Sequence, residues 1–136
     1  MSSERSAFER YVFIGNRDDH LRNHGFLFRA GGWQLSPLYD ALPIPATRGS
    51  RPFSLSLDFG DDGAVATLDN LLSSHREFNL DQSGAAAIIA EVAEGTAGWE
   101  GVLKECGVEK EDLEAVRWPF EGFRTLFAKE LAAFAT

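Results

Sequence analysis

The chain changes character near residue 60, and this change limits its fold more than any other feature. Glycine, proline and asparagine interrupt the first 60 residues at short intervals, a pattern typical of turns and loops. From residue 61 onward, apolar residues recur at helical spacing, which indicates amphipathic helices. The sequence therefore predicts a mainly α-helical scaffold over residues 61–136 and a loop-rich part with a small β-hairpin over residues 1–60.

Length and composition favour one domain over residues 1–136. The 136 residues are 44% hydrophobic and 25% charged, enough for a single core. A formal net charge of −8 argues against direct nucleic-acid binding, which depends on Lys and Arg neutralising phosphates. Cys106 is the sole cysteine, so a disulfide framework and a Cys-based zinc site are excluded. With no signal peptide and no membrane-length apolar run, we expect a cytoplasmic protein without membrane association.

The loop-rich part has four expected elements. Residues 4–14 have helical spacing and lead into a polar loop. Residues 26–28 and 33–35 flank a glycine-containing turn and predict two short strands joined as a hairpin. Residues 53–57 alternate apolar and polar side chains, which predicts a half-buried strand ending at a turn over residues 60–63. The acidic, glycine-containing turn would repel phosphates, so we interpret it as an ordinary turn.

The helical part begins with two capping signals. Thr67 is expected to cap a helix through about residue 74, and Asp81 a longer one that ends at Gly107. Two shorter helices are predicted over residues 109–116 and 119–134. Cys106 falls on the apolar side of the long helix and is expected to be buried. The three tryptophans, far apart in sequence, are expected to act as packing anchors: Trp33, Trp99 and Trp118.

Three oxygen-bearing side chains suggest phosphoryl-transfer chemistry. Asp18 and Asn23 have the spacing of the catalytic aspartate and a metal-binding asparagine in protein kinases, and Asp40 follows after the predicted hairpin. Mg²⁺ prefers hard oxygen ligands, which carboxylate and amide groups supply. Arg17 and Arg22 can neutralise phosphate or pair with the local acids.

Two other interpretations of this segment stay open on spacing alone. Asp18, Asp19 and Asn23 can be turn formers, because Asp and Asn side chains hydrogen-bond to nearby backbone. Alternatively, His20 and His24, four residues apart, would present two imidazoles beside Asp18 to a transition metal if the segment were helical. Such a site would suit a metal-dependent hydrolase, although Asn16 and Gly25 indicate a loop.

Two longer runs closely resemble the C-terminal region of the HipA family of serine/threonine kinases. The family pattern is approximately D-x-H-x-K-N, an aromatic hairpin, and then L-[ST]-P-x-Y-D. In this chain the corresponding runs are Asn16-Arg17-Asp18-Asp19-His20-Leu21-Arg22-Asn23 and Leu35-Ser36-Pro37-Leu38-Tyr39-Asp40. The segment from residue 68 to 80 and the long helix after it are also similar to that family's tail. Arg22 stands where the family usually has lysine, which keeps the charge and changes its geometry.

The resemblance implies a fold equivalent to much of the C-terminal lobe of a HipA-like kinase, together with roles for the named residues. Asp18 corresponds to the catalytic aspartate, Asn23 and Asp40 to magnesium ligands, and Arg22 to a residue that can touch phosphate. The cofactors implied are Mg²⁺ and ATP. The implied partners are a protein substrate and a DNA-binding HipB-like antitoxin.

The family's glycine-rich phosphate loop and its ATP-gripping lysine belong to an N-terminal lobe that these 136 residues do not contain. We therefore expect weak or absent ATP binding by this chain alone, and self-association or capture by a partner lobe. A catalytic segment that needs the other lobe and a non-catalytic interaction module both remain open.

Overall fold

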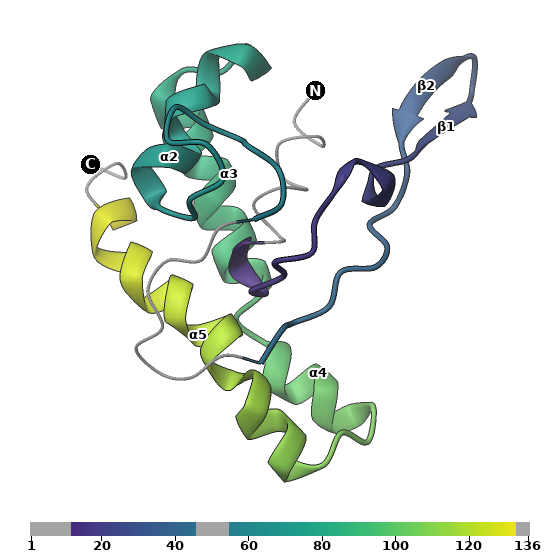
Figure 1. The fold of residues 1–136 in the computed structure, drawn as a ribbon, viewed down its shortest axis with the longest axis vertical. Coiled ribbons are helices and arrows are strands. Elements are labelled where there is room, and N and C mark those ends of the chain that lie inside the picture. The colour runs from purple at the N-terminus through teal and green to yellow at the C-terminus, as the bar shows by residue number, and fades with distance from the viewer. Residues whose placement is uncertain (1–11, 46–54, 133–136) are drawn as a thin grey trace.

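A computed structural model describes residues 12–45 and 55–132. Its fold is mainly α-helical with one two-stranded antiparallel sheet, as the sequence predicts (Figure 1). The elements in chain order are η1 Leu21–Asn23, β1 Phe26–Arg29, β2 Gly32–Leu35, α2 Leu68–Ser73, η2 Ser74–Phe78, α3 Gln82–Gly95, α4 Trp99–Glu105 and α5 Lys110–Ala132.

The predicted hairpin forms and extends away from the helices (Figure 1). Its register pairs Phe26 with Leu35 and Phe28 with Trp33. Ala30 and Gly31 at the turn have φ of 52° and 81°, and positive φ at both central residues matches the twist of a tight hairpin. The Phe28 and Trp33 rings meet edge to face at 5.4 Å.

Both predicted N-caps are confirmed. The Thr67 hydroxyl oxygen accepts a hydrogen bond from the Asn70 N–H at the start of α2. The Asp81 carboxylate accepts one from the Gly84 N–H, at 2.7 Å, at the start of α3. Each cap satisfies a backbone donor that has no partner within the first helical turn.

Two helix boundaries differ from the prediction. The expected helix over residues 81–106 is broken, because α3 ends at Gly95 and α4 starts anew at Trp99. Conversely, α5 runs without interruption through Pro119, where the sequence predicts a boundary between two helices. Pro119 is buried, and its packing offsets the hydrogen bond that proline removes from a helix interior.

Three expectations about single residues and strands also need correction. Cys106 is exposed at the end of α4 rather than buried, since α4 turns Trp99 inward and stacks it on Phe120 at 4.7 Å. Trp33 is not a packing anchor, because 71% of it is exposed on the hairpin. Residues 55–57 form no strand. The remainder of that predicted strand, and residues 4–11 of the first predicted helix, lie outside the described residues.

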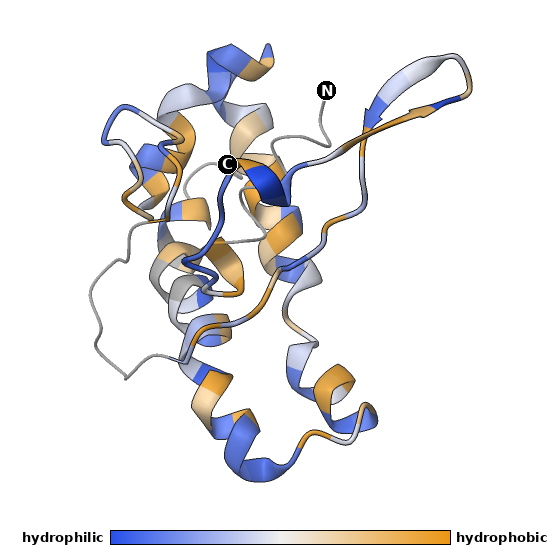
Figure 2. Ribbon diagram, turned by 45° about the vertical axis from the view of Figure 1, so that its right-hand side comes forward, coloured by the Kyte–Doolittle hydropathy of each residue, from blue (hydrophilic) through white to orange (hydrophobic). Residues whose placement is uncertain are grey.

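The core lies among α2, α3 and α5, with the segment at residues 12–13 packed into it. Apolar stretches lie on helix sides that face one another, whereas those of β1 lie out on the hairpin (Figure 2). Phe13 meets Phe127 of α5 edge to face at 5.9 Å. Among the described residues, no helix combines the length and apolarity that a bilayer crossing requires. The buried apolar members of the core are Val12, Phe13, Leu55, Ala66, Leu68, Leu71, Leu72, Ala85, Ala86, Ile89, Val92, Ala93 and Phe127.

Candidate functional site

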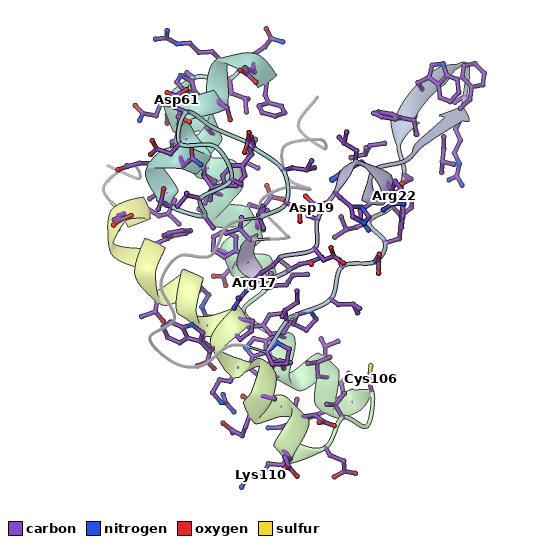
Figure 3. All side chains as sticks on the ribbon, viewed as in Figure 1. Arg17, Asp19, Arg22, Asp61, Cys106 and Lys110 are labelled. Atoms are coloured by element: carbon purple, nitrogen blue, oxygen red, sulfur yellow. The ribbon has the colours of Figure 1, made fainter. Side chains whose placement is uncertain are left out.

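The polar loop begins at Gly15, where helix α5 limits the space available. Gly15 has φ of +67°, and a Cβ there would lie 2.6 Å from Cβ of Pro119. Only glycine fits both the left-handed backbone and this close approach. Helix α5 therefore sets the position from which the loop departs. Arg17, Asp19 and Arg22 mark its course in Figure 3.

Asn16 joins the two ends of the site. It is 2% exposed, and its Oδ1 accepts a hydrogen bond from the Asp18 N–H at 2.9 Å. Its Nδ2 donates to the backbone carbonyl of Asp40 at 3.2 Å, across 24 residues. Sequence reasoning missed this role, although an asparagine two residues before Asp18 is the pattern of an Asx turn.

The two predicted magnesium ligands meet. Asn23, in η1, is 3% exposed, and its Nδ2 donates to Oδ2 of Asp40 at 2.9 Å. Asp40 has φ of +56°, a conformation that Asp and Asn adopt more readily than most residues. The hairpin lies between them in sequence and returns the chain so that the pair can form.

The other two predicted site residues lie on the exposed side of the loop. Asp18 and Arg22 are both exposed, and among the described residues no direct hydrogen bond joins the Asp18 carboxylate to Asn23 or Asp40. The Arg22 carbonyl accepts a hydrogen bond from the Tyr39 hydroxyl at 2.6 Å. That bond ties the end of η1 to the residue before Asp40.

A second pair, which sequence reasoning missed, closes the loop on its buried side. Oδ1 of Asp19 lies 2.7 Å from Nε2 of His24, and Asp19 is fully buried. Burial raises the pKa of the Asp19 carboxyl, and the neighbouring His24 partly opposes that rise. Oδ2 of Asp19 and Nδ1 of His20 are buried without a hydrogen-bond partner among the described residues.

The interpretation as a transition-metal centre loses its ligands in this arrangement. His24 is directed to Asp19, and the part of the chain that the structure describes has no group of three His, Cys, Asp or Glu side chains able to hold a metal ion. The turn-former interpretation accounts for part of the arrangement, since Oδ1 of Asn23 accepts the nearby His20 N–H. It does not account for the side-chain contacts of Asn23 with Asp40 and of Asp19 with His24.

The donor chemistry at Asn23 and Asp40 fits Mg²⁺. A carboxylate and an amide oxygen are hard ligands, and Mg²⁺ beside phosphates needs only one or two of them because it keeps water. Oδ1 of Asn23 accepts the His20 N–H at 3.0 Å, and an amide oxygen has a second lone pair for a cation. The exposed Asp40 carboxylate completes the pair.

The family model described as the HipA-like C-terminal domain matches residues 4–99. This range contains the polar loop, the hairpin, α2 and α3, whereas α5 lies beyond it. No match was found among curated proteins or among solved structures.

Proposed function

Because the chain belongs to the family of HipA-like C-terminal domains, we propose that its polar loop is the catalytic loop of a serine/threonine protein kinase of a toxin–antitoxin system. The reaction is transfer of the terminal phosphate of Mg-ATP to a protein hydroxyl. One observation carries the proposal: Asn23 and Asp40, 17 residues apart, meet at 2.9 Å. A chance pair of turn formers has no reason to converge across a hairpin.

In this proposal Asp18 is the catalytic base. Its carboxylate is exposed, so a substrate hydroxyl can reach it, and Asn16 fixes its backbone N–H at 2.9 Å. The carboxylate accepts or orients the proton of the attacking hydroxyl, which is the task of the aspartate in a kinase catalytic loop. Positioning contributes strongly here, because phosphoryl transfer needs little covalent chemistry from the protein.

Asn23 and Asp40 would hold the cation through their side-chain oxygens. Bound Mg²⁺ would neutralise charge on the nucleotide phosphates. Arg22, at the end of η1, contributes a guanidinium that can touch phosphate. The Tyr39–Arg22 hydrogen bond keeps this residue beside the chain segment that carries Asp40.

In this proposal the catalytic base and the metal ligands come from the described residues. A kinase nucleotide site also needs a glycine-rich phosphate loop. We therefore propose an N-terminal kinase lobe as a partner, with weak Mg-ATP binding by these 136 residues alone. A HipB-like antitoxin and a protein substrate are the further partners of the assembled kinase.

The exposed hairpin supports a second candidate, a non-catalytic interaction module that binds an antitoxin-like partner. Its apolar face combines Phe26, Phe28 and Trp33, which are 55%, 61% and 71% exposed. Exposed apolar clusters of this kind often mark interaction surfaces. This candidate needs the hairpin and does not need the Asp18 carboxylate.

One experiment separates the two candidates. The chain is mixed with a separately expressed glycine-rich N-terminal lobe of a HipA-like kinase, and transfer of labelled γ-phosphate to protein is measured. Asp18→Asn is the test variant. Asp61→Asn is the matched control, since Asp61 is also exposed and lies in the turn far from the loop (Figure 3).

If Asp18 is the base, Asp18→Asn lowers phosphate transfer by at least about 10²-fold, the usual contribution of general-base catalysis. Asp61→Asn leaves transfer unchanged. Equal transfer by Asp18→Asn and the native chain would refute the catalytic assignment. A complex that forms with the lobe but transfers no phosphate would favour the interaction module.

A further inference from the structure

Two residues outside the predicted catalytic set enclose the loop. Asp19 directly follows Asp18, and His24 directly follows Asn23. The side chains of this second pair meet at 2.7 Å. The contact therefore ties together the backbone neighbours of the base and of a metal ligand, and limits how far these two can move apart.

We propose that Asp19 and His24 are positioning residues, whose buried contact holds Asp18 and Asn23 at the separation that the loop needs for phosphoryl transfer. This inference rests on the proposed function of the loop. It adds two residues that touch neither substrate nor cation and act through their neighbours.

Burial makes the contact specific. Asp19 is fully buried and the His24 side chain is 13% exposed, so water competes little for the bond. Exposed ion pairs contribute little because solvent screens them. Removing the partner of a buried carboxylate leaves the cost of its desolvation uncompensated, which destabilises the structure around it.

The hydrogen bonds inside the enclosed segment show what the pair would fix. The Asn23 N–H donates to the His20 carbonyl at 2.8 Å, and the His20 N–H donates to Oδ1 of Asn23 at 3.0 Å. The first bond closes the backbone turn, and the second holds Oδ1 of Asn23 so that its Nδ2 faces Oδ2 of Asp40. Asp19 directly precedes this turn in sequence and His24 directly follows it, so their contact closes the turn.

The direction of the bond follows from its chemistry. A carboxylate has only acceptors, so Nε2 of His24 donates when Asp19 is ionised. Glutamine has an amide nitrogen, Nε2, at the same number of bonds from Cβ as the imidazole Nε2. His24→Gln can therefore keep the donor, whereas His24→Leu removes it and retains an apolar side chain of moderate size.

The test compares Asp19→Leu, which removes the acceptor, with His24→Leu and His24→Gln in the 136-residue chain. Mn²⁺ serves as a paramagnetic substitute for Mg²⁺, and its affinity is measured from the broadening of NMR signals near Asn23 and Asp40. A second readout, in metal-free protein, is hydrogen exchange at the His20 N–H. Arg117→Gln is the stability control, because Arg117 pairs with glutamates on α4 and α5 and takes no part in the loop.

We expect Asp19→Leu and His24→Leu to weaken Mn²⁺ binding on the order of tenfold, as for partners that orient metal ligands. The same variants should speed exchange at the His20 N–H. His24→Gln should keep both readouts within about twofold of the native chain, because its donor replaces the imidazole. Arg117→Gln should keep both as well, which would exclude a general loss of stability as the cause.

Unchanged Mn²⁺ affinity and unchanged exchange in Asp19→Leu and His24→Leu would overturn the inference, even if Asp40→Ala abolishes metal binding. Failure of His24→Gln to rescue would also overturn it, since the donor would then not be the active feature. If the native chain binds no Mn²⁺, the proposed metal site fails. Exchange at the His20 N–H then decides whether the pair positions the loop.

Discussion

Among the described residues, a buried asparagine side chain holds each of two polar turns, and the two asparagines have different partners. Asn70 of α2 is 1% exposed and holds the turn over residues 60–63 through backbone groups. Its Oδ1 accepts the Asp62 N–H, and its Nδ2 donates to the carbonyls of Gly63 and Val65, each at 2.8 Å. In the polar loop, Oδ1 of Asn23 also accepts a backbone N–H, but its Nδ2 donates to the side chain of Asp40.

The difference lies in where polar groups are directed. All the hydrogen bonds of the Asn70 side chain close the turn on itself, which is a structural use. In the polar loop, the contact joins the side chains of Asn23 and Asp40, which lie on either side of the hairpin. Exposed aspartates occur in both turns and do not distinguish them. The turn over residues 60–63 has the sequence Gly-Asp-Asp-Gly, and α2 supplies its asparagine.

The largest expected effect breaks the structural turn. Asn70→Ala removes three hydrogen bonds to partly buried backbone groups, so we expect a loss of about 3 kcal/mol in the free energy of unfolding. Urea unfolding followed by circular dichroism measures it. Mn²⁺ affinity, measured where the variant is still folded, should stay at the native value. A loss below about 1 kcal/mol would show that solvent replaces these bonds easily.

A somewhat smaller effect is expected where the polar loop starts. Gly15→Ala combines left-handed strain with a collision against Pro119, and we expect a loss of about 2 kcal/mol in the free energy of unfolding. Unlike Asn70→Ala, this variant should also weaken Mn²⁺ binding, because the loop departs from a displaced position.

Gly107→Ala is the matched control for Gly15→Ala. Gly107 has φ of +83°, and no atom lies within 4 Å of the position that a Cβ would take, so this variant carries the strain without the collision. It should cost about 1 kcal/mol and leave Mn²⁺ affinity unchanged. Equal losses in the two variants would mean that contact with α5 does not constrain the loop.

The sequence predicts what depends on local signals. The hairpin follows from two apolar runs around a glycine turn, and the two helix starts follow from Thr67 and Asp81, because each acts within a few residues. The order of Asn23 and Asp40 around the hairpin indicates that they converge. These features need no knowledge of which distant side chains pack together.

What the sequence did not predict depends on packing between distant segments. Pro119 breaks a helix by local rules, yet α5 continues there and supports Gly15, more than 100 residues earlier. The linking role of Asn16 becomes visible only when Asp40 is brought beside it. The Asp19–His24 pair was missed because a loop has no fixed period that indicates which side chains share a face.

The smallest expected effect sharpens the comparison through pH. Burial raises the pKa of Asp19 above its ordinary value of 3.8. Between that value and the raised one, the folded state binds more protons than the unfolded state, so this carboxyl makes the free energy of unfolding fall as pH rises. The Asp19→Asn variant has no carboxyl at this position and therefore lacks this pH-dependent contribution. The difference in unfolding free energy between the native chain and Asp19→Asn should therefore decrease as pH rises from about 4 and become constant above the raised pKa.

Urea unfolding at a series of pH values measures this difference, with Asp61→Asn as the comparison from the structural turn. Asp61 is exposed, so Asp61→Asn shows the effect of replacing a surface carboxyl by an amide. If the difference in unfolding free energy between the native chain and Asp19→Asn rises with pH instead, attraction to His24 outweighs the cost of burial. The Asp19–His24 contact would then act as an ion pair that favours the charged carboxylate. Such a rise would reverse the expected sign of the pH dependence. It would still distinguish the two turns, because it would come from a side-chain pair that the described turn over residues 60–63 lacks.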